Sequence, residues 1–116
     1  MILLIVRMKV RPEKRTELSQ TIASLSLSII MEKGCQRCDI CRSTEDENRF
    51  FLLEEWDTKK NLMIHLKSEH FKILRGAASL LEESLEMTLH TLFQPQEMEE
   101  TTQIQLKSGL SYLEDL

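Results

Sequence analysis

Four short stretches of the chain are predicted to be β-strands, two from a period of two residues and two as short bounded segments that can pair as a hairpin. The stretches are residues 2–10, 35–43, 49–57 and 85–93. In the first of them every second side chain is apolar, so one face of that strand is expected in the core. This face carries Ile2, Leu4, Val6, Met8 and Val10.

Two further stretches carry apolar residues at helical spacing. The first helix is expected to start near Pro12, which suits a first helical turn, and to run to about Met31. Its buried stripe is Leu18, Ile22, Leu25 and Ile29. Gly34, shortly after the last apolar residue, is a typical helix stop.

The second helix is expected to begin after Thr58, whose hydroxyl can cap its first turn. The helical pattern is interrupted near Ser68, and we expect a break or kink there before the helix resumes. Its later apolar stripe is Phe71, Leu74, Ala78 and Leu81.

The resulting order, β-α-β-β-α-β, is typical of a ferredoxin-like α+β fold, in which one antiparallel sheet carries both helices on one face. We expect residues 1–93 to form this domain. Residues 94–116 are expected to form an acidic linker and a short amphipathic helix over residues 107–113. That helix either latches onto a partner subunit or is disordered.

The second face of the predicted sheet has no cover within this domain. Leu3 and Ile5 are expected there, together with either Phe51 and Leu53 or the alternate pair, Phe50 and Leu52. Soluble monomers rarely expose an apolar patch of this kind. The pattern therefore predicts a homodimer whose two sheets meet face to face, with a small-molecule pocket between each sheet and its helices or loops.

Charge and composition exclude some classes of partner. The net charge is −4, and the excess of acid lies entirely in residues 94–116, so nucleic acid is not an expected partner. The chain has no apolar run long enough for a membrane span and no pattern typical of a secretion signal. Its three cysteines cannot all pair within one chain, and we expect a reducing, cytoplasmic location.

The candidate catalytic residues are His65 and His70, which follow the third strand. Imidazole can act as a general base near neutral pH or donate to a developing oxyanion. The two residues lie about 140° apart around an ideal helix, so they converge only if the helix breaks between them. Otherwise they have only a structural role, as a helix cap or as surface residues of the helix.

The candidate substrate-binding residues are Trp56, Glu54, Phe51 and Arg7. Trp56 either stacks on a flat aromatic substrate or anchors the core where the strand meets the helix. Glu54 shares the strand parity of Trp56 and acts either as a base or as the partner of Arg7 or Arg42, because a buried carboxylate needs a partner.

Three cysteines follow the spacing Cys35-x-x-Cys38-x-x-Cys41, which resembles a metal or redox motif. On a regular strand Cys35 and Cys41 would share one face and Cys38 would take the other. Such an arrangement does not converge on one tetrahedral ion. We therefore expect packing roles for these thiols and no metal.

The order and spacing of several short motifs resemble the antibiotic biosynthesis monooxygenase (ABM) domain, a dimeric α+β barrel family that includes quinol monooxygenases. The motifs are Gly34-Cys35, Arg42-Ser43, Glu54 with Trp56, His65 nine residues after the tryptophan, and Ser68-Glu69-His70-Phe71. The resemblance covers roughly residues 1–93.

The resemblance implies oxygen insertion into an electron-rich aromatic substrate such as a quinol, without metal, flavin or haem. Haem-degrading relatives are expected to carry Asn near the end of strand one and Trp and His on the second helix, where this chain has Val6, His65 and Arg75. Quinol-type members often place tyrosines on strand two where Cys38 and Cys41 stand.

Two other functions stay open on the same scaffold, because a fold does not settle chemistry. One is a non-catalytic dimeric module that binds a small molecule or serves a stress response. The other is an isomerase.

Overall fold

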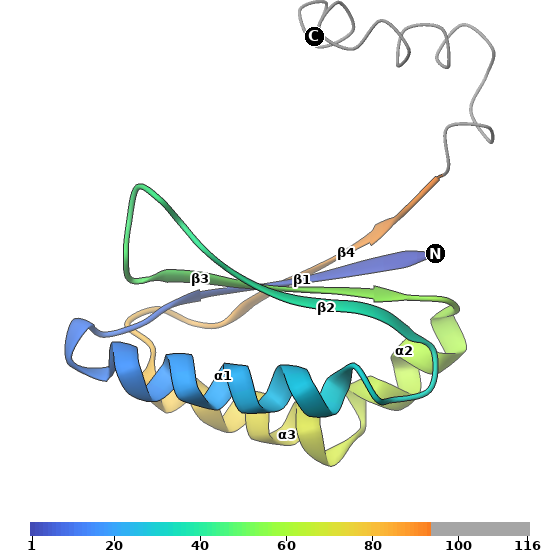
Figure 1. Ribbon diagram of the computed structural model, residues 1–116, viewed down its shortest axis with the longest axis horizontal. Helices are drawn as coiled ribbons and strands as arrows, with labels where there is room; N and C mark the ends of the chain where they lie inside the picture. Colours follow the sequence, from blue (N-terminus) through green and yellow to red (C-terminus); the bar gives the residue numbers. More distant parts are fainter. Residues whose placement is uncertain (94–116) are drawn as a thin grey trace, which may run out of the picture.

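The computed structural model describes residues 1–93 and has the predicted ferredoxin-like α+β fold (Figure 1). Its elements are strand β1 (Ile2–Lys9), a 3-10 turn (Pro12–Lys14), helix α1 (Arg15–Ile29), β2 (Cys35–Arg42), β3 (Arg49–Trp56), α2 (Lys59–Leu66), α3 (Glu69–Gly76), a second 3-10 turn (Ala77–Leu80) and β4 (Glu86–Thr91). The linker and helix predicted for residues 94–116 lie outside the described residues.

The four strands form one antiparallel sheet in the order β2-β3-β1-β4. The three helices lie together on one side of this sheet, and the other side is left open (Figure 1). The expected hairpin of the second and third strands is confirmed, with Ile40 opposite Leu52.

Strand parity decides which apolar residues enter the core. Phe50 and Leu52 are buried beneath the helices, so Phe51 and Leu53 lie on the open face. The predicted core residues Leu4, Val6 and Met8 of β1 are buried, as is Val10 just after the strand, and Ile2 packs beside them.

Helix α1 buries the predicted stripe of Leu18, Ile22, Leu25 and Ile29. It ends at Ile29, slightly before the expected Met31, and a turn leads from it to β2. Gly34 in this turn has φ +90°, a left-handed conformation that favours glycine. Its carbonyl accepts a hydrogen bond from the backbone N–H of Asp57 at 2.9 Å, which holds the turn beside the start of α2.

The expected break in the second helix is confirmed, and it produces two short helices. The hydroxyl of Thr58 caps α2 by accepting from the N–H of Asn61, and the hydroxyl of Ser68 caps α3 by accepting from the N–H of Phe71. The cap at Ser68 starts α3 in a direction different from that of α2. His65 on α2 and His70 on α3 are therefore no longer related by the geometry of one straight helix.

The apolar stripe of α3 is confirmed for Phe71 and Leu74, but the expected burial of Ala78 is wrong. The chain passes from α-helix into a 3-10 turn after Gly76, and the tighter winding shifts the buried position to Ala77.

The predicted parity of the cysteines is also wrong. A bulge between Cys35 and Arg37 places Cys35 and Cys38 on the helix-covered face, because an extra residue reverses the alternation of side chains. Burial raises the pKa of the Cys35 thiol to about 11 and that of the Cys38 thiol to about 12. Residues 1–93 contain no group of three or more metal-binding side chains that could hold an ion.

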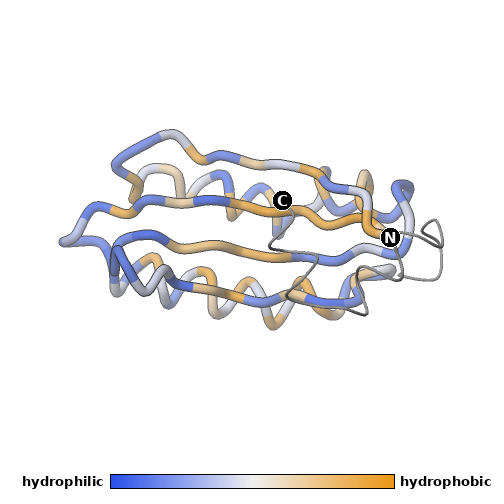
Figure 2. Tube along the Cα trace, turned by 90° about the horizontal axis from the view of Figure 1, so that it is seen from above, coloured by the Kyte–Doolittle hydropathy of each residue, from blue (hydrophilic) through white to orange (hydrophobic). Residues whose placement is uncertain are grey.

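Apolar residues gather in the middle of the two central strands, β1 and β3 (Figure 2), and on the open face charged residues such as Arg7 and Glu55 flank them. Ile5 pairs directly with Leu53 across β1 and β3, and Arg7 pairs with Phe51. All four side chains stay partly exposed. No helix in the described part of the chain is both long and apolar enough to span a membrane.

We predict that Gly34→Ala lowers the free energy of unfolding, because the new Cβ would lie 2.5 Å from Oδ1 of Asp57 and 2.6 Å from Cβ of Asn61. The left-handed backbone alone should cost about 1–3 kcal/mol. Urea unfolding measures the loss. Gly76→Ala is the matched control: a Cβ there meets nothing within 4 Å, and the helical backbone should gain about 0.5–1 kcal/mol. Equal effects of the two substitutions would contradict this account.

Candidate active site

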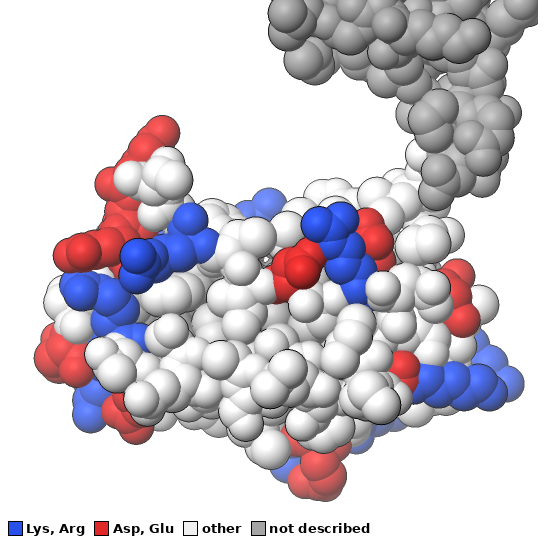
Figure 3. Space-filling view, in the orientation of Figure 1, with Lys and Arg blue, Asp and Glu red and all other residues white. Residues whose placement is uncertain are grey.

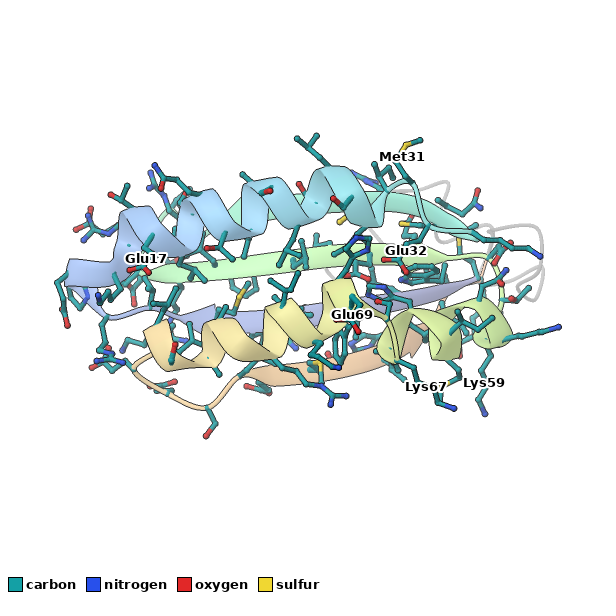
Figure 4. The ribbon with its side chains drawn as sticks, turned by 90° about the horizontal axis from the view of Figure 1, so that it is seen from below. Glu17, Met31, Glu32, Lys59, Lys67 and Glu69 are labelled. Atoms are coloured by element: carbon teal, nitrogen blue, oxygen red, sulfur yellow. The ribbon has the colours of Figure 1, made fainter. Side chains whose placement is uncertain are left out.

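Four ionisable side chains from four separate segments meet under the helices at one end of the sheet. They are Glu54 on β3, Glu32 in the turn after α1, His65 on α2 and His70 on α3, and we call them the carboxylate–imidazole network. Figure 4 shows Glu32 turned toward the gap between α1 and α2, while Met31 beside it points outward.

His65 lies at the centre of this network and is fully buried. Its Nδ1 lies 2.9 Å from Oε2 of Glu32, at hydrogen-bonding geometry. Its Nε2 lies 2.9 Å from Oε1 of Glu54 but is not aligned for a hydrogen bond, so this contact is an electrostatic one. The imidazole is thus held between two carboxylates.

Trp56 and Glu54 support His65 from the sheet. The indole Nε1–H donates to Oε1 of Glu54 at 3.0 Å. The indole ring stacks on the imidazole, with centroids 4.5 Å apart. Both Trp56 and Glu54 are fully buried, which agrees with the interpretation of Trp56 as a core anchor.

The expected pairing of Glu54 with Arg7 or Arg42 is wrong. Arg7 lies on the opposite face of the sheet, where its Nη1 donates to Oγ1 of Thr88 at 2.8 Å. Arg42 pairs with Phe50, toward the other end of β3. Oε2 of Glu54 is buried and has no hydrogen-bond partner, so the positive partner of this carboxylate is His65.

Opposing effects act on the pKa of His65. Burial is the largest and lowers the pKa, but the two neighbouring carboxylates together outweigh it and raise the pKa above 6.5. Glu54 and Glu32 both favour the imidazolium form. The stacked indole adds a favourable contact to a cationic ring.

Glu32 is the member of the network that the sequence pattern did not indicate. Its Oε2 accepts from Nδ1 of His65 at 2.9 Å and lies 3.0 Å from Nδ1 of His70. The available signal was its place just before Gly34, since that turn is held against the start of α2. Helical periodicity does not report on such turn residues.

His70 is the exposed end of the network, with 36% of its side chain accessible. It borders a surface groove of about 550 Å³ between α1 and α3, opposite Ser24, Ser28 and Leu25 of α1 and beside Ile73 of α3. Helix α1 carries no charged residue after Glu17, and Figure 3 shows a broad uncharged surface over it.

The structure separates the six candidate residues into two groups. Glu54, Trp56 and His65 are brought into direct contact, and Glu32 connects His70 to them. Arg7 and Phe51 are cross-strand neighbours on the open face. Substrate binding by Arg7 and Phe51 stays a prediction, but they do not belong to the network.

The sequence was compared with models of known protein families. The family model described as "Antibiotic biosynthesis monooxygenase" matches residues 1–75. The chain belongs to this ABM family. The matched range contains every member of the carboxylate–imidazole network.

Individual relatives agree with this assignment. The chain is 33% identical over 72 residues to "Putative monooxygenase YcnE" of Bacillus subtilis (strain 168), covering 62% of this chain and 76% of that protein. Among solved structures, a "Putative antibiotic biosynthesis monooxygenase" from Nitrosomonas europaea has a TM-score of 0.76 at 25% identity, covering 81% of this chain and all 100% of that one. A conserved protein from Methanosarcina mazei Go1 has a TM-score of 0.75 at 27% identity, covering 79% and 92%.

For this ABM protein the geometry allows different roles for the two imidazoles. His65 is fully buried, so it can orient the side chains around it and interact electrostatically with them. It cannot reach a ligand in the described conformation. His70 reaches solvent and can exchange a proton with a ligand in the groove. The sequence prediction treated the two histidines alike, and burial distinguishes them.

We predict that the stabilising contribution of His65 depends on pH. Its folded-state pKa lies above 6.5, so the contribution is complete below about pH 6.5 and is lost as the pH rises through the folded-state pKa. Urea unfolding at a series of pH values between about 6 and 9 measures this loss. Glu54→Gln removes one of the charges that favour the imidazolium and should flatten the dependence. Parallel curves for the wild type and this variant would contradict the assignment.

Proposed function

We propose that this ABM protein is a cofactor-independent monooxygenase that acts on a small, electron-rich aromatic substrate of the quinol class. The proposal is supported by the family assignment and by one observation above all. The network leaves a single imidazole, that of His70, partly exposed beside an uncharged groove. A phenol or quinol is a ligand that such a base and such a surface suit.

The proposed reaction needs a base more than it needs any other group. Removal of a proton from a quinol hydroxyl gives an electron-rich phenolate, and this anion can transfer electrons to O₂. For a simple quinol, one quinol and one O₂ give one hydroxyquinone and one water. One oxygen atom enters the ring and the other is reduced to water, and the substrate supplies all four electrons.

We predict that His70→Ala lowers kcat for oxygen uptake with a naphthoquinol by about 10²–10⁴-fold, the usual contribution of a general base. An oxygen electrode measures the rate after subtraction of a protein-free blank. Labelled ¹⁸O₂ and mass spectrometry show whether oxygen enters the product, which separates a monooxygenase from an oxidase that releases peroxide.

His90→Ala is the control for this experiment, because His90 is exposed on β4 and contacts only Thr88 among hydrogen-bonding side chains of residues 1–93. Its rate should equal that of the wild type. Equal rates in His70→Ala and the wild type would reject His70 as the base. His65→Ala is less informative, since it also leaves a cavity beside two buried side chains.

A second function is favoured by the burial of Glu54, Trp56 and His65. These three fully buried side chains, which contact one another, are suited to holding α2 against the sheet, as in a non-catalytic binding module. Such a module would show a rise in melting temperature with a quinol but no oxygen uptake. An isomerase would form product under anaerobic conditions, which an oxygenase cannot do.

We also propose that the protein is a homodimer that pairs through the open face of the sheet. Burying each large apolar side chain there should stabilise the dimer by about 1.5–3 kcal/mol. Ile5 and Leu53 are direct cross-strand neighbours near the centre of this face, so they are its natural test positions.

The double variant Ile5→Asp/Leu53→Asp should sediment as a monomer at concentrations where the wild type is a dimer, because two carboxylates cannot be buried against an apolar sheet. Leu27→Asp, on the outer side of α1 where the leucine is 74% exposed, should remain dimeric. Sedimentation of the wild type as a monomer would reject the dimer.

A further inference from the structure

We propose that Glu32 is the positioning residue that makes His70 a base, by holding its ring in the tautomer whose free nitrogen faces away from the network. This inference rests on the proposed function, in which His70 takes a proton from the substrate. Glu32 touches neither substrate nor oxygen in this scheme and acts only through the two imidazoles.

The first support is that both histidines share one oxygen of Glu32. Oε2 lies 2.9 Å from Nδ1 of His65 and 3.0 Å from Nδ1 of His70. An ionised carboxylate can only accept, so each Nδ1 must carry its hydrogen. For a neutral His70 this leaves Nε2 as the nitrogen with a free lone pair.

The second support is that the other histidine cannot serve as the base. Nε2 of His65 lies 2.9 Å from Oε1 of Glu54, and the ring is fully buried. His65 is held between two carboxylates and has no route to a ligand in the groove. Glu32 therefore contacts one buried imidazole and one partly exposed imidazole.

The third support is the fixed position of the Glu32 carboxylate. Its backbone N–H donates to the carbonyl of Ile29 at 2.9 Å, and its carbonyl accepts from the N–H of Cys35 at 3.2 Å. The side chain is only 17% exposed. The turn that Gly34 closes thus presents a carboxylate at a defined place between α2 and α3, and both rings orient toward it.

The charged environment of His70 makes this assignment testable. Glu32 faces it from the turn, with His65 and Glu54 behind, while the α1 residues across the groove are uncharged. On its own helix the adjacent Glu69 is exposed and lies 3.5 Å from Lys72. Glu69→Gln therefore removes a nearby charge without touching the network, and it is the matched control for Glu32→Gln.

The decisive experiment is ¹⁵N–¹H correlation NMR of the histidine rings at about pH 8, where a neutral imidazole prevails, in the wild type, Glu32→Gln and Glu69→Gln. We expect Nδ1–H on His70 in the wild type and in Glu69→Gln. We expect Glu32→Gln to shift His70 toward the Nε2–H tautomer, which is the commoner form of a free imidazole. A wild-type His70 that carries its hydrogen on Nε2 would overturn the proposal without any variant.

The kinetic arm uses the same three proteins. Glu32→Gln should lower kcat for quinol-dependent oxygen uptake by about 10- to 150-fold, which corresponds to the loss of a hydrogen bond to a charged group, with KM little changed. Glu69→Gln should match the wild type in both kcat and KM.

The outcomes separate this inference from the proposed function. A change of tautomer in Glu32→Gln without a change in kcat overturns the positioning role. No oxygen uptake by the wild type, together with the expected tautomers, supports the role of Glu32 in orienting His70 and overturns the oxygenase proposal. Equal effects of the Glu32 and Glu69 variants overturn the specific role of Glu32.

Discussion

The structure depends on an imidazole buried between two carboxylates. Burying a charged group in a protein interior costs free energy unless the group is paired and hydrogen-bonded. The fold must therefore bring His65, Glu54 and Glu32 into contact with one another's partners at the same place. Each comes from a different element: a helix, a strand and a turn. The break between α2 and α3 and the left-handed glycine of the α1–β2 turn are the backbone features that bring both carboxylates within 3 Å of the His65 ring.

Much of the fold follows from local patterns, because local physics decides it. Alternation of apolar residues set the parity of β1, whereas the parity of β3 stayed open until the structure placed Phe50 and Leu52 in the core. The caps at Thr58 and Ser68 set the two helix starts. The stripe of α1 was predictable for the same reason: apolar residues at helical spacing have only one way to be buried.

The site was less predictable because it depends on departures from regular geometry and on contacts distant in sequence. A bulge reversed the parity of Cys35, and a change of helix type displaced Ala78. Glu54 was expected to find an arginine, yet the arginine nearest on the adjoining strand lies on the opposite face. Glu32 stands 33 positions before His65, and no periodicity connects a turn residue to a helix that follows two strands.

The two faces of the sheet carry different chemistry, and this separation bears on how a dimer and a site could coexist. The open face opposite the helices contains Ile5 and Leu53, whereas the network lies on the helix side and is most exposed at His70, beside α1 and α3. A second copy on the open face would therefore cover Arg7 and Phe51 without closing the groove. Pairing of subunits and access of a ligand to His70 are compatible in this arrangement.

The network is poorly explained by stability alone. Buried ion pairs contribute little net stability relative to apolar residues of similar volume, and Oε2 of Glu54 lies buried without a partner. Buried ionisable groups held against charged partners are instead frequent at functional sites. Oε2 of Glu32 lies within hydrogen-bond distance of Nδ1 of both rings, and a carboxylate that accepts there requires a hydrogen on each Nδ1. The burial of Glu54 and His65 thus has its chemical consequence at the surface, on the free nitrogen of His70.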